Sequence, residues 1–146
     1  METPSVKGYR YFITFTDDFS RYTHLGLCKL KDDALGIFKS WLARAEKETG
    51  KSLKVFQSDG GGEFTSGAFK AFLDEKGIKR EVTNAYTPQE NGVSECANQT
   101  LNNLAHSMMA DAKGVLQVKL LLPNLWSHAV CHAAWIKNHI PSQSLY

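Results

Sequence analysis

The sequence is short of the features that mark secreted and membrane proteins. Its 146 residues include three cysteines, Cys28, Cys96 and Cys131, which are scattered and form no paired motif. An odd, scattered set of thiols is typical of an intracellular protein rather than of a disulfide scaffold. No apolar run approaches the about 18 residues that suggest a membrane span, and no signal peptide precedes the first strand-like segment. We therefore expect a nuclear or cytoplasmic protein that is not secreted and has no membrane partner.

A strong excess of one charge is also missing. The formal net charge is +2, with 22% charged and 42% hydrophobic residues, which is ordinary for a globular domain. This composition permits a nucleic-acid partner but does not indicate one, since a strongly basic domain would be the better indication of nucleic-acid binding.

Apolar periodicity predicts one α/β domain over residues 1–146. Strands are expected at 9–15, 21–30, 53–57 and 78–82, where aromatic and β-branched residues gather. Helical spacing predicts a helix that Asp32 and Asp33 cap and Gly50 closes, and a second helix from Ser66 to Gly77. Two more helices are expected at 93–112 and 123–140, and residues 60–62 and 83–92 are expected to be loops. This order of elements indicates a mixed sheet flanked by helices.

Two carboxylates stand out in this pattern. Asp59 follows a short apolar strand, the place where open α/β sheets bind ligands. Glu95 lies near the start of the third helix, opposite its apolar stripe, and 35 residues separate it from Asp59. Oxygen ligands of this kind suit Mg²⁺ or Mn²⁺, and two such ions about 3.5–4 Å apart can drive phosphoryl transfer. A plainer interpretation stays open at this point: Asp59 as a turn former, and Glu95 as a favourable first-turn charge.

Three segments bear on this choice. TDDFSRYTHL (16–25), SDGGGEFTS (58–66) and AYTPQENGVSE (85–95) resemble the integrase catalytic cores of copia-type retrotransposons, and the resemblance covers essentially the whole chain. It implies a ribonuclease-H-like fold and DNA 3′-processing and strand transfer by metal-dependent polynucleotidyl transfer. Asp59 and Glu95 match the family's second and third catalytic carboxylates and would bind Mg²⁺ or Mn²⁺. The implied partners are retroelement ends and target DNA, and a homo-oligomer is left open.

The resemblance also implies a carboxylate that the sequence does not supply. In the family it lies on the central strand of the sheet, before the segment matching residues 9–15, and residues 1–16 contain no Asp. We therefore expect an N-terminally truncated domain with a gapped or rearranged sheet, two open strand edges and impaired activity. Asp17 or Asp18 could substitute at the metal, although a turn-forming pair is the plainer interpretation.

The loop before the third helix is the expected nucleic-acid contact. Backbone amides and side-chain oxygens there could position a phosphate backbone, and the resemblance supports that role for Pro88, Gln89, Asn91, Gly92 and Gln99. An ordinary helix-entry loop is compatible with the same residues. Relatives usually carry Arg and Lys after the catalytic Glu, whereas here no Lys or Arg occurs between Glu81 and Ala112. We expect weak DNA affinity, because each lost phosphate contact removes about 0.9 from the slope of the salt dependence.

A second interpretation belongs to another functional class. The chain could be a non-catalytic retroelement remnant that binds nucleic acid weakly or pairs with a protein through an open sheet edge. His128, Cys131 and His132 fall within about one helical turn and could hold zinc, but with no second ligand pair a packing or surface role fits them better. A divalent-metal titration separates the two interpretations, because only the enzyme should bind Mn²⁺ through Asp59 and Glu95.

Overall fold

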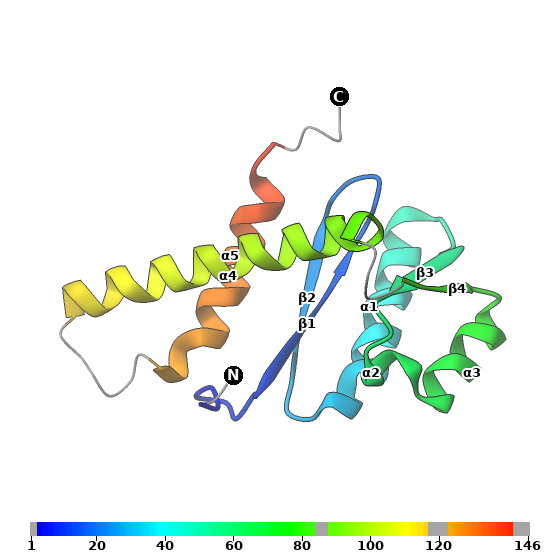
Figure 1. Cartoon of the computed structure of the whole chain (residues 1–146), viewed down its shortest axis with the longest axis horizontal. Helices are drawn as coiled ribbons and strands as arrows, with labels where there is room; N and C mark the ends of the chain where they lie inside the picture. The colour runs from blue at the N-terminus through cyan, green and yellow to red at the C-terminus, as the bar shows by residue number, and fades with distance from the viewer. Residues whose placement is uncertain (1–2, 84–87, 117–122, 142–146) are drawn as a thin grey trace. The chain divides into compact units, whose positions relative to one another are not determined.

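The computed structural model describes residues 3–83, 88–116 and 123–141, and the chain divides into two compact units. The first unit comprises Met1–Leu30 and Val93–Tyr146, and the second comprises Lys31–Gly92. Strands and helices of both units confirm the predicted α/β class (Figure 1). Within the described residues, no helix is both long and apolar enough to cross a membrane.

A β-hairpin forms the sheet of the first unit. Strands β1 (Tyr11–Thr16) and β2 (Thr23–Cys28) run antiparallel, with Tyr11 opposite Cys28 and Thr16 opposite Thr23. Aromatic and β-branched residues dominate β1, as strands prefer. Residues 17–22 connect the strands, so β2 begins two residues later than the predicted strand at 21–30.

Two helices pack with this hairpin. They are α4 (Pro88–Leu116) and α5 (Trp126–His139), and the short 3-10 helix η2 (Pro123–Leu125) precedes α5. The core that they share consists of small and apolar side chains: Leu101, Ala105, Trp126, Val130, Ala133 and Ala134. Phe12, Leu25 and Leu27 of the hairpin pack against this core. The amphipathic pattern therefore buries one stripe of each helix.

The end of α5 is fastened to the start of β2 by side chains. Asn138 accepts the Thr23 N–H at 2.9 Å and donates to the Thr23 carbonyl at 2.8 Å. The Lys137 ammonium donates to the Arg21 carbonyl at 2.8 Å and to the Thr23 hydroxyl at 2.9 Å. Partial burial lowers the pKa of Lys137, and the positive charge of Arg21 lowers it further.

A parallel strand pair forms the sheet of the second unit. Strands β3 (Val55–Ser58) and β4 (Lys79–Val82) are joined through the short helix α2 (Gly62–Thr65) and through α3 (Gly67–Lys76). Helix α1 (Ala34–Thr49) follows the 3-10 turn η1 (Lys31–Asp33). The elements give the strand–helix–strand order that a parallel pair requires.

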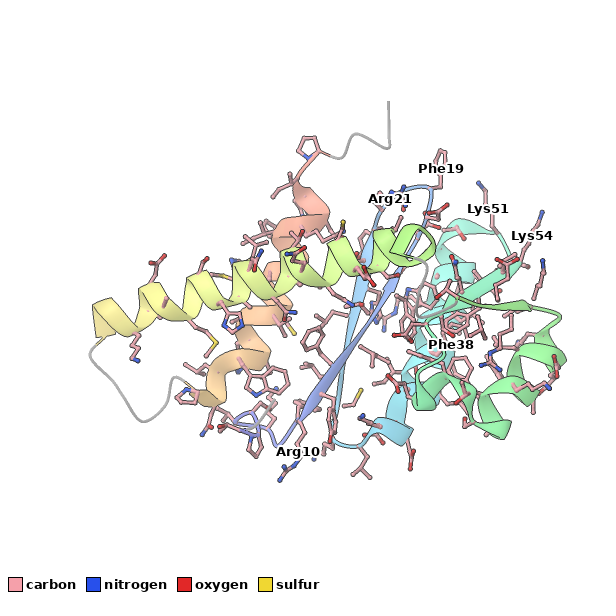
Figure 2. All side chains as sticks on the ribbon, viewed as in Figure 1. Arg10, Phe19, Arg21, Phe38, Lys51 and Lys54 are labelled. Atoms are coloured by element: carbon pink, nitrogen blue, oxygen red, sulfur yellow. The ribbon has the colours of Figure 1, made fainter. Side chains whose placement is uncertain are left out.

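Aromatic rings make the core of the second unit. Phe38, which Figure 2 labels, is fully buried. Its ring centroid lies 4.9 Å from that of Phe56 and 5.1 Å from that of Phe69. Phe64 adds contacts at 5.8 Å to Phe56 and 5.6 Å to Phe69. Tilted and edge-on rings at these separations stabilise beyond the area that they bury.

The capping residues read from the sequence predicted the ends of α3 correctly, but they did not predict how α1 begins. The Ser66 hydroxyl accepts the Phe69 N–H at 3.3 Å, and Gly77 ends α3 with φ +69°, as predicted. The predicted side-chain cap at Asp33 is wrong: that residue has helical backbone angles and makes no capping hydrogen bond. A 3-10 turn over residues 31–33 enters α1 in place of the cap, which is common at helix starts.

Two predicted loops are partly helical. Helix α2 begins at Gly62, inside the stretch predicted to be a flexible loop, and α4 begins at Pro88 rather than at residue 93. Proline suits the first helical position because its φ is preset and no N–H is needed there. The rest of the predicted loop, residues 84–87, lies outside the described residues.

Candidate functional site

Asp59 lies directly after β3 in the second unit and is exposed. Its Oδ1 accepts the backbone N–H of Gly61 at 3.0 Å, which holds the carboxylate against the following turn. Gly60 in that turn has φ +79°, and a Cβ there would lie 3.2 Å from Cγ1 of Val82. Glycine is required at this position because other residues rarely adopt such a φ. The turn thus presents the Asp59 carboxylate to solvent at the carboxyl end of the parallel pair.

A second carboxylate, that of Glu63 on α2, lies beside Asp59. A Cβ at Gly61 would be 3.1 Å from Oε2 of Glu63 and 3.2 Å from Oδ1 of Asp59. The two side chains therefore flank a space that Gly61 leaves open by having no side chain. Glu63 was not among the predicted site residues, because residues 60–62 were expected to form a loop. Its spacing, four residues after Asp59 across three glycines, was the available signal.

This donor set fits a divalent cation. Carboxylate oxygens are the ligands that Mg²⁺ and Mn²⁺ prefer. Neither Asp59 nor Glu63 forms an ion pair with a lysine or arginine of the described residues. The hydroxyl of Ser58 has no hydrogen-bond partner among the described residues, but Ser58 lies on the buried face of β3 with Phe56. The open space at Gly61 is bordered by the two carboxylate oxygens and therefore suits a cation.

Glu95 belongs to the first unit, where it is exposed on α4. One turn further along the helix, Oδ1 of Asn98 accepts the Thr14 hydroxyl of β1 at 2.7 Å. Residues three apart are neighbours on a helix surface, so this bond anchors the part of α4 that carries Glu95. Glu95 and Asp59 lie in different units, and each is described within its own.

The side chains of Asp17 and Asp18 are engaged in the hairpin turn. Oδ2 of Asp17 accepts the Ser20 N–H at 2.7 Å and the Ser20 hydroxyl at 2.6 Å. Asp18 pairs with the Arg21 guanidinium at 2.7 Å, and Arg21 has the left-handed φ of 60°. Figure 2 shows Arg21 and Phe19 at the tip of this hairpin. These contacts support the turn-forming interpretation, and a role at the metal stays a prediction.

The predicted nucleic-acid contacts lie in the first two turns of α4, except Gln99, which lies in the fourth turn. The side chains of Pro88, Gln89 and Asn91 are outside the described residues. Gly92 is half-buried and Gln99 is exposed. Their contact with nucleic acid stays a prediction.

A histidine-based metal site gains no support. His128, Cys131 and His132 are all exposed, and the His132 ring stacks on Trp135 with centroids 6.0 Å apart. Among the described residues, no group of three or more His, Cys, Asp or Glu side chains could hold a metal ion. The carboxylate pair at Gly61 is therefore a partial ligand set within its own unit.

Comparisons with known proteins match this chain to one family, the integrase core domain. Residues 1–88, which include Asp59, match the family model of the integrase core domain. The Pol polyprotein of transposon TNT 1-94 from Nicotiana tabacum is 39% identical over 145 residues, 99% of this chain and 10% of that protein, so that alignment also takes in Glu95. The chain spans about a tenth of the length of the curated relatives it matches.

Solved structures share the fold. The catalytic core domain of HTLV-2 integrase, in complex with magnesium and in a trimeric form, has a TM-score of 0.61 at 23% identity, covering 94% of this chain and 80% of that chain. The dimeric form of the same domain, also with magnesium, has a TM-score of 0.60 at 22% identity, covering 91% and 77%.

Proposed function

Because this chain belongs to the integrase core domain family, as found in copia-type retroelement Pol polyproteins, we propose that it serves DNA integration by divalent-metal-dependent polynucleotidyl transfer. The reactions would be 3′-processing of the element's ends and strand transfer into target DNA. In this proposal Asp59 and Glu95 hold Mg²⁺ or Mn²⁺. The observation that carries it is the exposed Asp59 carboxylate at the end of β3, beside a second carboxylate and the open space at Gly61.

Each part of the site has a separate task in this proposal. When bound, the metal ions supply positive charge that activates a water and stabilises the leaving oxygen. The Gly61 N–H orients one oxygen of Asp59, which leaves the other free to bind. The Thr14–Asn98 bond holds the part of α4 that presents Glu95. Gly60 and Gly61 keep side chains out of the space in front of Asp59, so that a phosphate could approach.

A Mn²⁺ titration of the full chain tests the proposal. Free Mn²⁺ is measured by electron paramagnetic resonance, and we expect saturable binding at millimolar concentration or below. Asp59→Asn should abolish binding, and Glu95→Gln should weaken it at least tenfold. Loss of a residue that merely supports a metal ligand already weakens metal affinity by about 10–100-fold, so loss of a ligand should cost at least as much. Asp74→Asn is the matched control, because Asp74 is exposed on α3 of the same unit. If no Mn²⁺ binds the unmutated chain, the enzymatic proposal fails.

The partners and cellular site are parts of the same proposal. We propose weak DNA binding, since no Lys or Arg occurs between Glu81 and Ala112. Submicromolar binding to duplex DNA at physiological salt would contradict it. The trimeric and dimeric forms of the HTLV-2 domain support a homo-oligomer. A reaction on chromosomal DNA would place the protein inside the cell.

One observation favours the alternative, a remnant that pairs with a protein. The strands of the described residues pair only in twos, so each of them is an edge strand. Edge strands are templates for pairing with another chain. Concentration-dependent self-association without Mn²⁺ binding would favour this second function over catalysis.

A further inference from the structure

We propose that the outer face of α5 is a self-association surface, on which two copies of this chain pair through a row of aromatic rings. Four exposed residues make up this face, and together they are called the α5 ring row: His128, His132, Trp135 and His139. The surface would form the homo-oligomer of the proposed function, on which this inference rests.

The spacing of the α5 ring row suits helix pairing. Its members follow one another at four, three and four positions, the interval of the residues that meet in paired helices. At about 3.6 residues per turn they share one side of α5, roughly opposite the buried Val130, Ala133 and Ala134. The buried side packs on the core of its own unit, so the ring row faces outward.

The rings are held in place within α5 itself. His132 stacks on Trp135 with centroids 6.0 Å apart and an interplanar angle of 3°. His139 stacks on the same indole at 4.0 Å and 23°, and its Nδ1 donates to the Trp135 carbonyl at 2.6 Å. Trp135 is nevertheless 58% exposed. Rings with fixed orientations lose little conformational freedom when a partner covers them, which favours binding.

Charge points to a second copy as the occupant. Helix α5 contains no Asp or Glu, and the ammonium of Lys137, its one Lys, bonds to the Arg21 carbonyl and the Thr23 hydroxyl. Within the described residues, no carboxylate forms an ion pair with a histidine of the row. While its histidines are neutral the row is uncharged, so its complement is another uncharged surface. Nucleic acid fits less well, because phosphate contacts rely on Lys and Arg.

A two-fold axis gives every ring of the row a partner. When two copies of α5 run antiparallel and are centred between residues 133 and 134, Trp135 of one copy lies opposite His132 of the other. His139 then lies opposite His128 in the same way. Four rings supply on the order of 400 Å² per copy, against about 800 Å² in a standard interface. We therefore expect a weak, reversible dimer.

Two competing explanations make different predictions. Side chains three or four positions apart stabilise a helix by themselves, which would alter thermal stability and leave the oligomeric state unchanged. Pairing through the strand edges of the described residues would also give a dimer. That dimer would not depend on Trp135, so substitutions in the ring row separate all three explanations.

Sedimentation velocity of the full chain, at concentrations from about 20 µM to 1 mM, tests the surface. We expect dimers whose fraction rises with concentration. Trp135→Lys removes the largest ring and puts a charge in the row, so the dimer should weaken at least about tenfold, as for an interface hot spot. Phe19→Lys is the matched control, because Phe19 is an exposed aromatic residue of the same unit. Its dimer should stay within about twofold of the unmutated one.

A charge-swap pair tests the two-fold arrangement. His132→Glu should also weaken self-association, because it puts a carboxylate against Trp135 of the other copy. Mixed in equal amounts with Trp135→Lys, it should form heterodimers more tightly than either variant forms homodimers, since the introduced charges then face each other. A change in the stability of α5 alone would not produce this recovery.

The pH dependence of the dimer tests the histidines. Histidine gains its charge as pH falls from about 8 to 5, and two charged rows repel, so the dimer should weaken at least about fivefold between pH 7.5 and 5.5. Burial raises the pKa of the Cys131 thiol beside the row, so it stays neutral. The hairpin turn next to the end of α5 carries Arg21, Asp17 and Asp18, residue types that ordinarily keep their charge over this range. Single-stranded DNA binding that strengthens at acid pH, without any dimer, would overturn the proposal.

The outcomes can be told apart from those of the Mn²⁺ titration. If the unmutated chain stays monomeric at neutral pH, this inference fails together with the homo-oligomer, and Mn²⁺ binding still decides the enzymatic part. If Trp135→Lys and Phe19→Lys dimerise equally well, the ring row is no interface and the strand edges are favoured. Weakening by Trp135→Lys and recovery in the mixture support the assignment, whether or not Mn²⁺ binds.

Discussion

The hydrogen bond from Thr14 to Asn98 ties β1 to α4, and its strength can be measured by a double-mutant cycle. The bond is 2.7 Å long and partly buried. Net contributions of such bonds are about 0.5–1.5 kcal/mol, whereas leaving one partner unsatisfied costs about 1–3 kcal/mol. We therefore expect Thr14→Val and Asn98→Leu each to lower the free energy of unfolding by about 1 kcal/mol. This is the lower end of the cost of an unsatisfied partner, because the pair is only partly buried.

The double variant is the decisive one. It removes both partners, so no polar group is left unpaired, and its cost should fall short of the sum of the single changes by about 0.5–1.5 kcal/mol. Urea unfolding followed by tryptophan fluorescence measures this, since Trp126 is buried in the core of the same unit. Asn103→Leu is the control, because Asn103 is exposed on the same helix. Additive single costs would refute the idea that this bond fastens α4.

Two further predictions concern the burial of one side chain in each unit. Phe38→Ala should lower the free energy of unfolding by about 3–5 kcal/mol, a large share of typical domain stability, because Phe38 is fully buried among aromatic rings. Urea denaturation should show almost no change for the control Phe19→Ala, because Phe19 is 79% exposed. Equal losses of stability in the two variants would contradict the assigned core. Because the pKa of Lys137 is lowered in the folded chain, the unfolded chain holds this proton to higher pH. The unmutated chain should therefore gain stability relative to Lys137→Met as pH rises through the lowered pKa towards the ordinary one. A difference in free energy of unfolding between the two chains that stays constant or shrinks over alkaline pH would count against partial burial of this ammonium.

Elements with strong local signals were predictable from the sequence, and elements fixed by packing were not. Ser66 and Gly77 carry the cap and the stop of α3 in their own chemistry, so the prediction holds to the residue. Helix α2 has four residues and no such signal. It forms because Phe64 packs on Phe56 and Phe69, a contact that depends on the fold of the whole unit. The start of α4 was placed late because glycine at position 92 suggested a loop, while Pro88 already suits a first helical turn.

The candidate site also contains residues that were predictable from local sequence and residues that were not. Asp59 was predictable because its place depends only on the end of a short strand, and the structure puts it there, exposed. The turn role of Asp17 was predictable from residue type, since Asp favours such turns, and its two bonds to Ser20 show that role. For Glu63 the sequence offered only its spacing from Asp59 across three glycines, and its place beside the space at Gly61 depends on the packing of α2. The Thr14–Asn98 bond joins positions 84 residues apart, so no local pattern could reveal it.

The two carboxylates of the proposed function are held by different parts of the chain. Asp59 follows β3 in the second unit, and Glu95 lies on α4 in the first unit. The Thr14–Asn98 bond fastens α4 within the first unit. Changes that loosen α4, such as Asn98→Leu, should therefore weaken Mn²⁺ binding no further than Glu95→Gln does, and the binding that remains should still be lost in Asp59→Asn.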